Sequence, residues 1–264
     1  MTTIESTPDI GVTLDAHVAL VELRRPPHNF MDVAIVDALA GTFERLDALD
    51  DCRAVVLASQ GKSFCAGANF APPPADGEPP VTRGLVAEDL YRQAVRLFRF
   101  GKPVVAAVHG AAIGGGLGLA VSADFRVTCR EAVFSANFAR LGMHAGFGLS
   151  HTLPALVGLQ KASLLLYTGR RIHGDEAFAI GLADELVDAS RVRDAALALA
   201  GEIAASAPLV VRSHRYSLRR GLAERVEVAT EREAYEQRWQ RMTEDHKEGV
   251  AAVAARRLPV FRGR

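Results

Sequence analysis

The sequence has few cysteines and no excess charge of either sign. Its three cysteines, Cys52, Cys65 and Cys129, are an odd number at unrelated spacings, which fits a reducing compartment better than a disulfide framework. Lys and Arg total 31, and Asp and Glu also total 31, so no bulk field favours nucleic acid or an anionic membrane as a partner. No His/Cys cluster has zinc-ligand spacing. We therefore expect no metal and no permanently bound cofactor.

Long apolar runs are missing as well. No uninterrupted apolar stretch is long enough to cross a bilayer. The first twelve residues, MTTIESTPDIGV, lack the basic leader and apolar core of a signal peptide. These absences predict a cytoplasmic protein without a membrane partner. A chain of 264 residues is long enough to bury one substantial core.

Short apolar runs alternate with segments of helical periodicity in the first 150 residues. Residues 71–84 are dominated by Pro and Gly, which predicts a surface loop. From residue 150 onward the patterns are mostly helical, which predicts an α/β core followed by a helical tail. The expected strands cover residues 10–14, 18–23, 54–58, 103–108 and 125–129, and the expected helices cover 31–49, 85–100, 192–205 and 222–239.

The most informative segment is residues 109–124, HGAAIGGGLGLAVSAD. It follows the expected strand at 103–108, and its three glycines, Gly114, Gly115 and Gly116, open a segment with helical character. A strand that turns through glycines into a helix leaves backbone N–H groups unpaired, and the helix dipole adds to their attraction for negative charge. Such a turn holds a phosphate or a reaction oxyanion. Alternatively, the glycines serve only tight packing of helix against strand.

The known phosphate-binding loops do not match this turn. The dinucleotide fingerprint G-x-G-x-x-G fails because Leu119 stands at its third glycine. A P-loop ending at Gly61-Lys62-Ser63 fails because Val56 stands at the leading glycine. No G-x-S-x-G is present, which excludes the nucleophile elbow of an α/β-hydrolase. An oxyanion site and a packing role remain.

A second small-residue turn, SFCAGANF at residues 63–70, follows the strand expected at 54–58. Together the two turns resemble those of the crotonase superfamily, also called the enoyl-CoA hydratase/isomerase family. The resemblance extends over nearly the whole chain and includes Arg25-Pro26-Pro27, residues 134–142, TGRRI at 168–172, and the tail residues 248–250 and 256–261.

The resemblance implies an α/β fold built as a spiral of β-β-α turns. It implies a spiral core over residues 1–200 and a helical region over residues 201–264 for oligomerisation and contact with coenzyme A. The ligand implied is an acyl-CoA thioester, so that coenzyme A enters as part of the substrate. The assembly implied is a homotrimer or a dimer of trimers.

The resemblance also assigns an oxyanion hole to the backbone N–H groups of Ala68 and Gly115. Bond making or breaking beside a thioester carbonyl places negative charge on its oxygen, as an enolate or a tetrahedral intermediate. Two preset donors stabilise that charge, and the loss of one typically costs about 10²–10³ in rate. A small residue at each position lets the backbone approach the thioester closely.

Two acidic residues that the family's hydratases use are absent. The first glutamate would stand at Gly118 and the second at Phe138. Some members carry an aspartate further along, near Ala145 or Gly146, and this chain has none there. Because hydration needs a general acid and a general base, ordinary hydration of an enoyl-CoA is not expected.

Other polar groups stand as candidates beside the oxyanion hole. His144 is either an acid/base group or a hydrogen-bonded turn histidine. Cys65 is either a nucleophile or a small buried residue. The family places a Lys that contacts adenosine phosphates, often from a neighbouring subunit, where this chain has Arg256. The contacts expected for substrate and coenzyme A are Arg25, His28, Phe64, Ala66, Asn69, Phe70, Phe138 and Arg256.

These observations predict a protein that processes acyl-CoA thioesters and stabilises a thioester oxyanion or enolate. The reactions considered are isomerisation, C–C cleavage, decarboxylation and thioester hydrolysis. The alternative is an acyl-CoA-binding protein without catalysis, because an apolar Phe138 suits the holding of an acyl chain.

Overall fold

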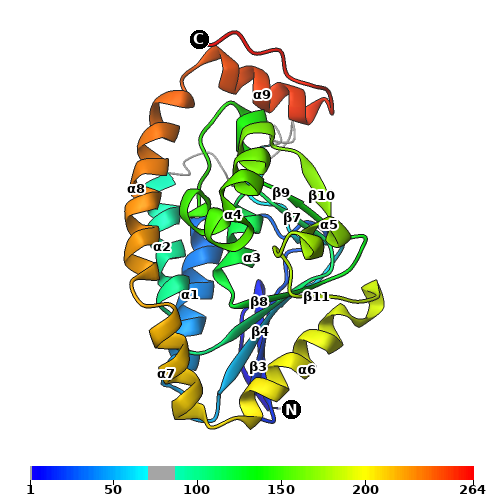
Figure 1. Ribbon diagram of the computed structural model, residues 1–264, viewed down its shortest axis with the longest axis vertical. Helices are drawn as coiled ribbons and strands as arrows, with labels where there is room; N and C mark the ends of the chain where they lie inside the picture. Colours follow the sequence, from blue (N-terminus) through cyan, green and yellow to red (C-terminus); the bar gives the residue numbers. More distant parts are fainter. Residues whose placement is uncertain (1, 71–86) are drawn as a thin grey trace.

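A computed structural model of the chain describes residues 2–70 and 87–264 (Figure 1). The surface loop expected at 71–84 lies outside the described residues. The expected strands and helices elsewhere are confirmed to within a few residues, including the helix at 31–49, which is α1 (Val33–Ala48). Asp32 caps its first turn by accepting a hydrogen bond from the Ile35 N–H. The buried Lys102 ammonium donates to the Leu46 and Leu49 carbonyls at its other end.

The larger sheet has seven strands in the order β1-β2-β3-β4-β6-β8-β11. Its first three strands pair antiparallel, and the pairs from β3 onward are parallel. The central strands β4 and β6 are buried along their whole length, as expected for parallel strands covered on both faces. The strands are β1 (Thr2–Ser6), β2 (Ile10–Asp15), β3 (Val18–Leu23), β4 (Ala54–Ser59), β6 (Val104–Val108), β8 (Phe125–Thr128) and β11 (Glu185–Leu186).

A second sheet of four short strands has the order β10-β9-β7-β5. Its members are β5 (Ser63–Cys65), β7 (Ala111–Ile113), β9 (Val133–Ser135) and β10 (Arg171–His173). The strands β4, β6 and β8 of the larger sheet are each followed by β5, β7 and β9 of the smaller sheet, and then by helical structure. This repeat confirms the expected spiral of β-β-α turns.

Helices cover both faces of the larger sheet. In Figure 1, α1, α2 and α8 lie side by side, and α6 packs on strands β4 and β6. The buried side chains of α2 follow a helical period, with Leu90 and Tyr91 one turn from Ala94 and Val95. The remaining helices are α2 (Ala87–Arg99), α3 (Gly115–Ser122), η1 (Asn137–Leu141, 3₁₀), α4 (Leu149–Thr168), α5 (Gly174–Ala179), η2 (Ala189–Arg191, 3₁₀), α6 (Val192–Ala205), α7 (Pro208–Leu218), α8 (Leu222–Gln240) and α9 (Glu244–Ala254).

The C-terminal helix α9 packs back onto η1 of the same chain. The His246 ring nitrogen Nδ1 lies 2.7 Å from the Leu141 carbonyl oxygen. A Cβ on Gly249 would lie 2.6 Å from the Leu141 carbonyl carbon, so a glycine is needed where the two segments meet. This packing carries the last residues of the chain over η1.

Within the part of the chain that the structure describes, no single helix is long and apolar enough to cross a membrane. One pair of segments, Ala189–Ala205 and Pro208–Leu218, satisfies the length and composition criteria only jointly, and it is bent by 107°. The same residues include no group of three or more His, Cys, Asp or Glu side chains placed to hold a metal ion.

Candidate active site

A cavity of about 620 Å³ lies between the two turns, η1, α2 and the C-terminal segment. It is lined by residues from several separate parts of the chain, which the spiral and the returning α9 bring together. Among the sequence-predicted residues, it contains Ala66, Ala68, Asn69 and Phe70 of the turn at 63–70, Gly115 of the glycine turn at 109–124, and also Phe138 and Arg256.

The two turns are in direct backbone contact. Their parent strands β4 and β6 are neighbours in the larger sheet, and β5 and β7 are neighbours in the smaller. Gly67 has a φ of +74°, and a Cβ there would lie 2.6 Å from the Ile113 carbonyl oxygen and 3.4 Å from the Gly115 nitrogen. A Cβ on Gly116 would overlap the Cys65 carbonyl oxygen. Glycine at 67 and 116 is therefore what allows the turns to meet.

Two backbone N–H donors, those of Ala68 and Gly115, lie where the two turns meet. Gly115 is the first residue of α3, so its N–H has no partner within the helix. Among residues 2–70 and 87–264, neither the Ala68 N–H nor the Gly115 N–H has a hydrogen-bond acceptor. The neighbouring Gly114 N–H, in contrast, donates to the Ser135 carbonyl at 2.8 Å. The cavity therefore contains two partly exposed residues whose N–H groups remain available to an oxygen atom.

Gly118, where the resemblance places the first family glutamate, has no room for a side chain. A Cβ on Gly118 would lie 2.5 Å from Phe147 Cβ and 2.7 Å from Phe147 Cγ. Phe147 is fully buried and has a φ of +63°, which is uncommon for an aromatic residue. Phe138, where the resemblance places the second glutamate, contributes an apolar ring to the cavity wall.

The polar side chains that line the cavity include no acid. Among the described lining residues, none is Asp, Glu, His or Lys. The polar ones are Asn69, Tyr91, Asn137, Arg171, Arg241 and Arg256. Sequence analysis did not select Tyr91, Arg171 or Arg241. A tyrosine on the apolar face of an amphipathic helix is a signal for Tyr91, because a buried hydroxyl needs a polar neighbour.

His144 and His28 lie near the cavity but are absent from its described lining. The His144 ring nitrogen Nδ1 is 3.0 Å from the Ala145 carbonyl oxygen, and the His144 backbone N–H donates to the Gln240 side chain. The His28 ring packs against Phe30, with 5.3 Å between centroids, and its Nδ1 lies 3.5 Å from Ser63 Oγ. Their expected roles in catalysis and binding remain predictions.

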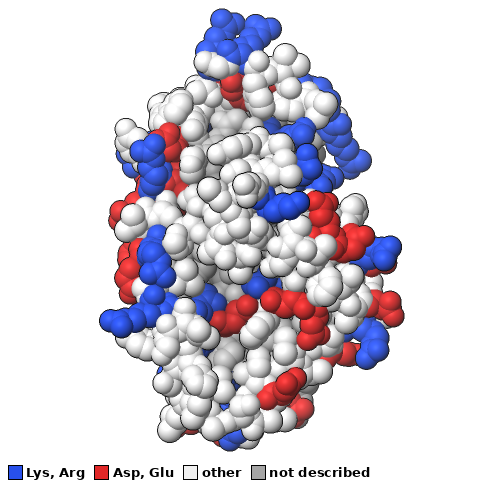
Figure 2. Space-filling view, in the orientation of Figure 1, with Lys and Arg blue, Asp and Glu red and all other residues white. Residues whose placement is uncertain are grey.

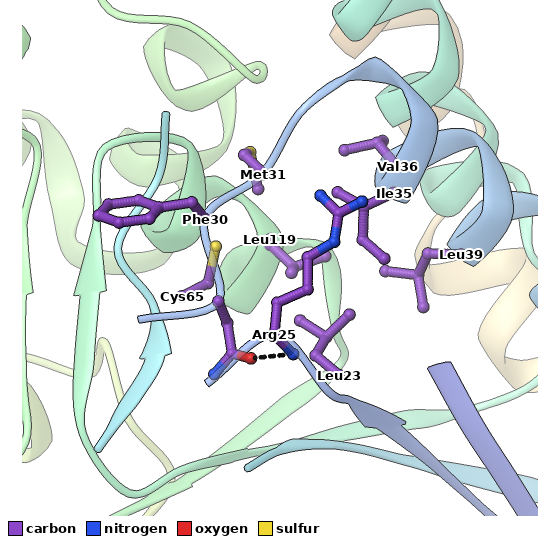
Figure 3. A pocket seen from close by; sticks show the side chains of 10 residues that line it. Leu23, Arg25, Phe30, Met31, Ile35, Val36, Leu39, Cys65 and Leu119 are labelled. Atoms are coloured by element: carbon purple, nitrogen blue, oxygen red, sulfur yellow. Dashed lines mark hydrogen bonds between the residues drawn. The ribbon is translucent and has the colours of Figure 1, made fainter. Parts of the chain in front are cut away.

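Arg25 and Phe64 have structural contacts instead of places in this cavity. Arg25 forms ion pairs with Asp9 and Asp32, both at 2.7 Å. Figure 3 shows Arg25 along a small cavity of about 10 Å³, with its backbone N–H donating to Asn29. Phe64 is fully buried in β5. Neither residue is among the described lining residues of the larger cavity, and their expected contacts with substrate and coenzyme A remain predictions.

Cys65 fits the buried alternative. Its side chain is fully buried, and desolvation raises the pKa of its thiol to about 12. A thiol with so high a pKa contains almost no thiolate near neutral pH, which is the form that acts as a nucleophile.

Arg256 lies at the cavity together with Val253 and Ala254 of the C-terminal segment. Figure 2 shows basic side chains gathered at the end of the molecule where α9 and the last residues lie. Arg257, Arg262 and Arg264 are exposed there, and Arg257 pairs with Glu248. Arg256 thus lines the cavity of the same chain to which it belongs.

A family model described as enoyl-CoA hydratase/isomerase matches residues 13–264. The chain belongs to the enoyl-CoA hydratase/isomerase family. It is 33% identical over 258 residues to the (E)-benzylidenesuccinyl-CoA hydratase of Thauera aromatica, covering 96% of this chain and 99% of that protein. It is 30% identical over 256 residues to the short-chain-enoyl-CoA hydratase of Clostridium acetobutylicum, covering 95% and 96%.

The fold of this family member is similar to that of a solved enoyl-CoA hydratase/isomerase from Pseudoalteromonas atlantica. The TM-score is 0.83 at 28% identity, and the match covers 96% of this chain and all of that one. Family membership places the chain in the crotonase superfamily, as the two turns indicated.

Proposed function

We propose that this protein binds acyl-CoA thioesters and holds the thioester carbonyl oxygen between the N–H groups of Ala68 and Gly115. The observation that carries the proposal is the pair of available donors at one cavity, where Gly67 and Gly116 let two turns touch. Relatives named for reactions of CoA thioesters support the ligand class. Coenzyme A would enter with the acyl group, and no separate cofactor is proposed.

Hydration of an enoyl-CoA is not the proposed reaction. Adding water across a double bond needs one group to remove a proton from water and another to protonate carbon. Gly118 and Phe138 replace the two glutamates, and no Asp or Glu is found among the described lining residues. The oxyanion hole is therefore proposed to stabilise the oxyanion of a reaction other than hydration.

Among the reactions considered, decarboxylation requires the fewest catalytic groups from the protein. The bond between the α-carbon of the acyl group and a carboxylate on that carbon breaks, carbon dioxide leaves, and the electron pair passes to the thioester oxygen as an enolate. The two N–H groups would stabilise that charge, and water would supply the proton that completes the product. Isomerisation and hydrolysis require a base, and none of the described lining residues is Asp, Glu, His or Lys.

The coenzyme A portion is proposed to reach the cavity beside Arg256. A guanidinium there would pair with phosphate oxygens, and the neighbouring basic residues in Figure 2 would add a favourable field. The assembly proposed is a homotrimer or a dimer of trimers. Exposed apolar side chains on α7, among them Leu209 at 80% and Leu218 at 86%, would be covered in such an assembly.

A second candidate is an acyl-CoA-binding protein without catalysis. The observation that favours it is Phe138, an apolar ring in the cavity wall at the position where catalytic members carry an acid. Mass spectrometry on a panel of acyl-CoAs, with calorimetry on the same panel, separates the two candidates. Catalysis predicts turnover that a Gly115→Pro variant lacks, and simple binding predicts micromolar affinity without turnover. No affinity for any acyl-CoA would contradict both.

A further inference from the structure

The Tyr91 hydroxyl is built into a buried polar group at the cavity. Tyr91 is 7% exposed and lines the cavity from α2. Its oxygen accepts a hydrogen bond of 2.8 Å from Gln237 Nε2, and that amide also donates to the His144 and Ala145 carbonyls, at 2.8 and 3.2 Å. The amide thus fixes the hydroxyl as an acceptor on one side. Within residues 2–70 and 87–264, the hydroxyl proton has no acceptor of its own.

The hydroxyl occupies the space that a side chain at position 146 would need. A Cβ on Gly146 would overlap the Tyr91 oxygen and lie 2.5 Å from its Cζ. Gly146 directly precedes Phe147, whose Cδ2 lies 3.8 Å from the place of a Cβ on Gly115. The Tyr91 hydroxyl therefore packs against Gly146, the residue next to Phe147, whose side chain packs on the glycine turn.

Tyr91 is a donor and not a base. Burial raises the pKa of its phenol well above the usual range, and the nearby Glu233 carboxylate acts in the same direction. The phenol therefore keeps its proton at every physiological pH. A ligand atom that takes this proton as a hydrogen bond has to be an acceptor, such as an oxygen of a carboxylate or carbonyl group.

Arg241 supplies positive charge to the same group. It directly follows α8 and lines the cavity, and its Nη2 lies 3.4 Å from Gln237 Oε1. Gln237 thus links the tyrosine hydroxyl to the guanidinium, and Gln237 itself is fully buried. The described residues that line the cavity include no carboxylate, and the nearby Glu233 lies outside that lining, where its carboxylate accepts hydrogen bonds from the Gly148 N–H and the Ser150 hydroxyl.

We propose that Tyr91 and Arg241 form a second anion subsite, which binds a carboxylate carried by the acyl group. The ligand class is then the monothioester of coenzyme A with a dicarboxylic acid. This inference rests on the proposed binding of CoA thioesters at Ala68 and Gly115. Burying a carboxylate beside Leu141 and Met143 is unfavourable without a donor and a countercharge, and the Tyr91 hydroxyl and the Arg241 guanidinium provide both.

Calorimetry with pairs of matched CoA thioesters tests the subsite. Each pair has one acyl length and differs only in the terminal group: succinyl and butyryl, glutaryl and pentanoyl, adipoyl and hexanoyl. The parent protein should bind at least one diacid thioester about tenfold more tightly than its neutral counterpart. Tyr91→Phe and Arg241→Gln should each reduce that ratio, and Arg241→Lys should restore part of it. Tyr216→Phe, at a tyrosine that is 72% exposed, should leave the ratio unchanged.

The outcomes separate this inference from the function on which it rests. Equal affinity of the parent protein for diacid and neutral thioesters would overturn the subsite and leave the thioester site standing. A preference that survives both Tyr91→Phe and Arg241→Gln would also overturn it. Failure to bind any thioester in the panel would overturn the proposed function itself. Circular dichroism of each variant verifies that a reduced ratio comes from a folded protein.

Discussion

Phe147 packs its Cβ and ring directly over Gly118, at 2.5 to 2.7 Å from where a Cβ on that glycine would lie. Gly118 is the position where the resemblance places the family's first glutamate, and Phe147 fills the space that a side chain there would need. Phe147 adopts a φ of +63° to reach this place, a backbone conformation with a steric cost for a residue with a side chain. The absence of a side chain at position 118 is thus part of the packing of this protein.

Restoring the glutamate alone should not create a hydratase. Gly118→Glu should lower the free energy of unfolding by about 1–3 kcal/mol, the usual cost of overpacking a filled core. Denaturant unfolding measures this cost, and a crotonyl-CoA assay should detect no hydration. Combining Gly118→Glu with Phe147→Gly should recover part of the stability, because glycine adopts a positive φ readily. A stable, hydrating Gly118→Glu protein would contradict this packing.

Arg256 should contribute to binding of coenzyme A through charge. Arg256→Gln should weaken the affinity for coenzyme A about fivefold at low ionic strength, since one solvent-accessible ion pair contributes about 1 kcal/mol. The difference should shrink as salt is added. Arg262→Gln, which removes an exposed arginine absent from the cavity lining, serves as the control in the same titration. Equal losses of affinity in the two variants would indicate that Arg256 acts through the general positive field and not through a specific contact with coenzyme A.

Cys65 should resist alkylation in the folded protein. With a pKa of about 12, only about one thiol in ten thousand is ionised at pH 8, and the side chain is also fully buried. Iodoacetamide at pH 8 followed by mass spectrometry should find Cys65 unmodified in the native protein and modified after unfolding. Labelling of Cys65 in the native protein at a rate typical of a free thiol would contradict its burial.

The assembly should depend on the apolar surface of α7. Light scattering of the parent protein should give a mass three or six times that of the 28.3 kDa chain. Leu218→Asp should shift the population towards smaller species, because a buried charge without a partner is strongly unfavourable at an interface. Leu218→Met, which keeps an apolar side chain of similar volume, should not. A monomeric parent protein would contradict the proposed trimer.

Much of the fold could be predicted from sequence, because its longer elements have clear periodicity. The hairpin of β2 and β3, the buried strands β4 and β6, and helix α1 all extend over five or more residues. The strands β5, β7, β9 and β10 were not predicted. Each has three residues, and three residues are too few to distinguish an alternating pattern from a turn.

The candidate site, like the fold, could be predicted from the sequence only in part. The glycine turns carry a local signal, but the choice of Ala68 and Gly115 within them came from the resemblance to the crotonase superfamily. The absence of acids at 118 and 138 is visible in the sequence itself. The filling of position 118 by Phe147 could not be predicted, because it depends on contact between segments 29 residues apart. Tyr91 and Arg241 likewise become neighbours only through Gln237, when α8 packs on α2.

The proposed function depends on the N–H groups of Ala68 and Gly115, which would hold a thioester oxygen. Gly115→Pro and Gly115→Ala form a matched pair, since both add a Cβ facing the flexible Met31 side chain, at 2.7 Å from its Sδ, and only proline removes the N–H. Proline is also tolerated at the first position of a helix.

Infrared spectroscopy of a bound acyl-CoA with an isotopically labelled thioester carbonyl measures the interaction without requiring turnover. Two hydrogen bonds weaken the carbonyl bond, so its stretching frequency should fall on binding to the parent protein and to Gly115→Ala. In Gly115→Pro most of that shift should be lost. An unshifted carbonyl in the parent protein, or the same shift in both variants, would contradict the account.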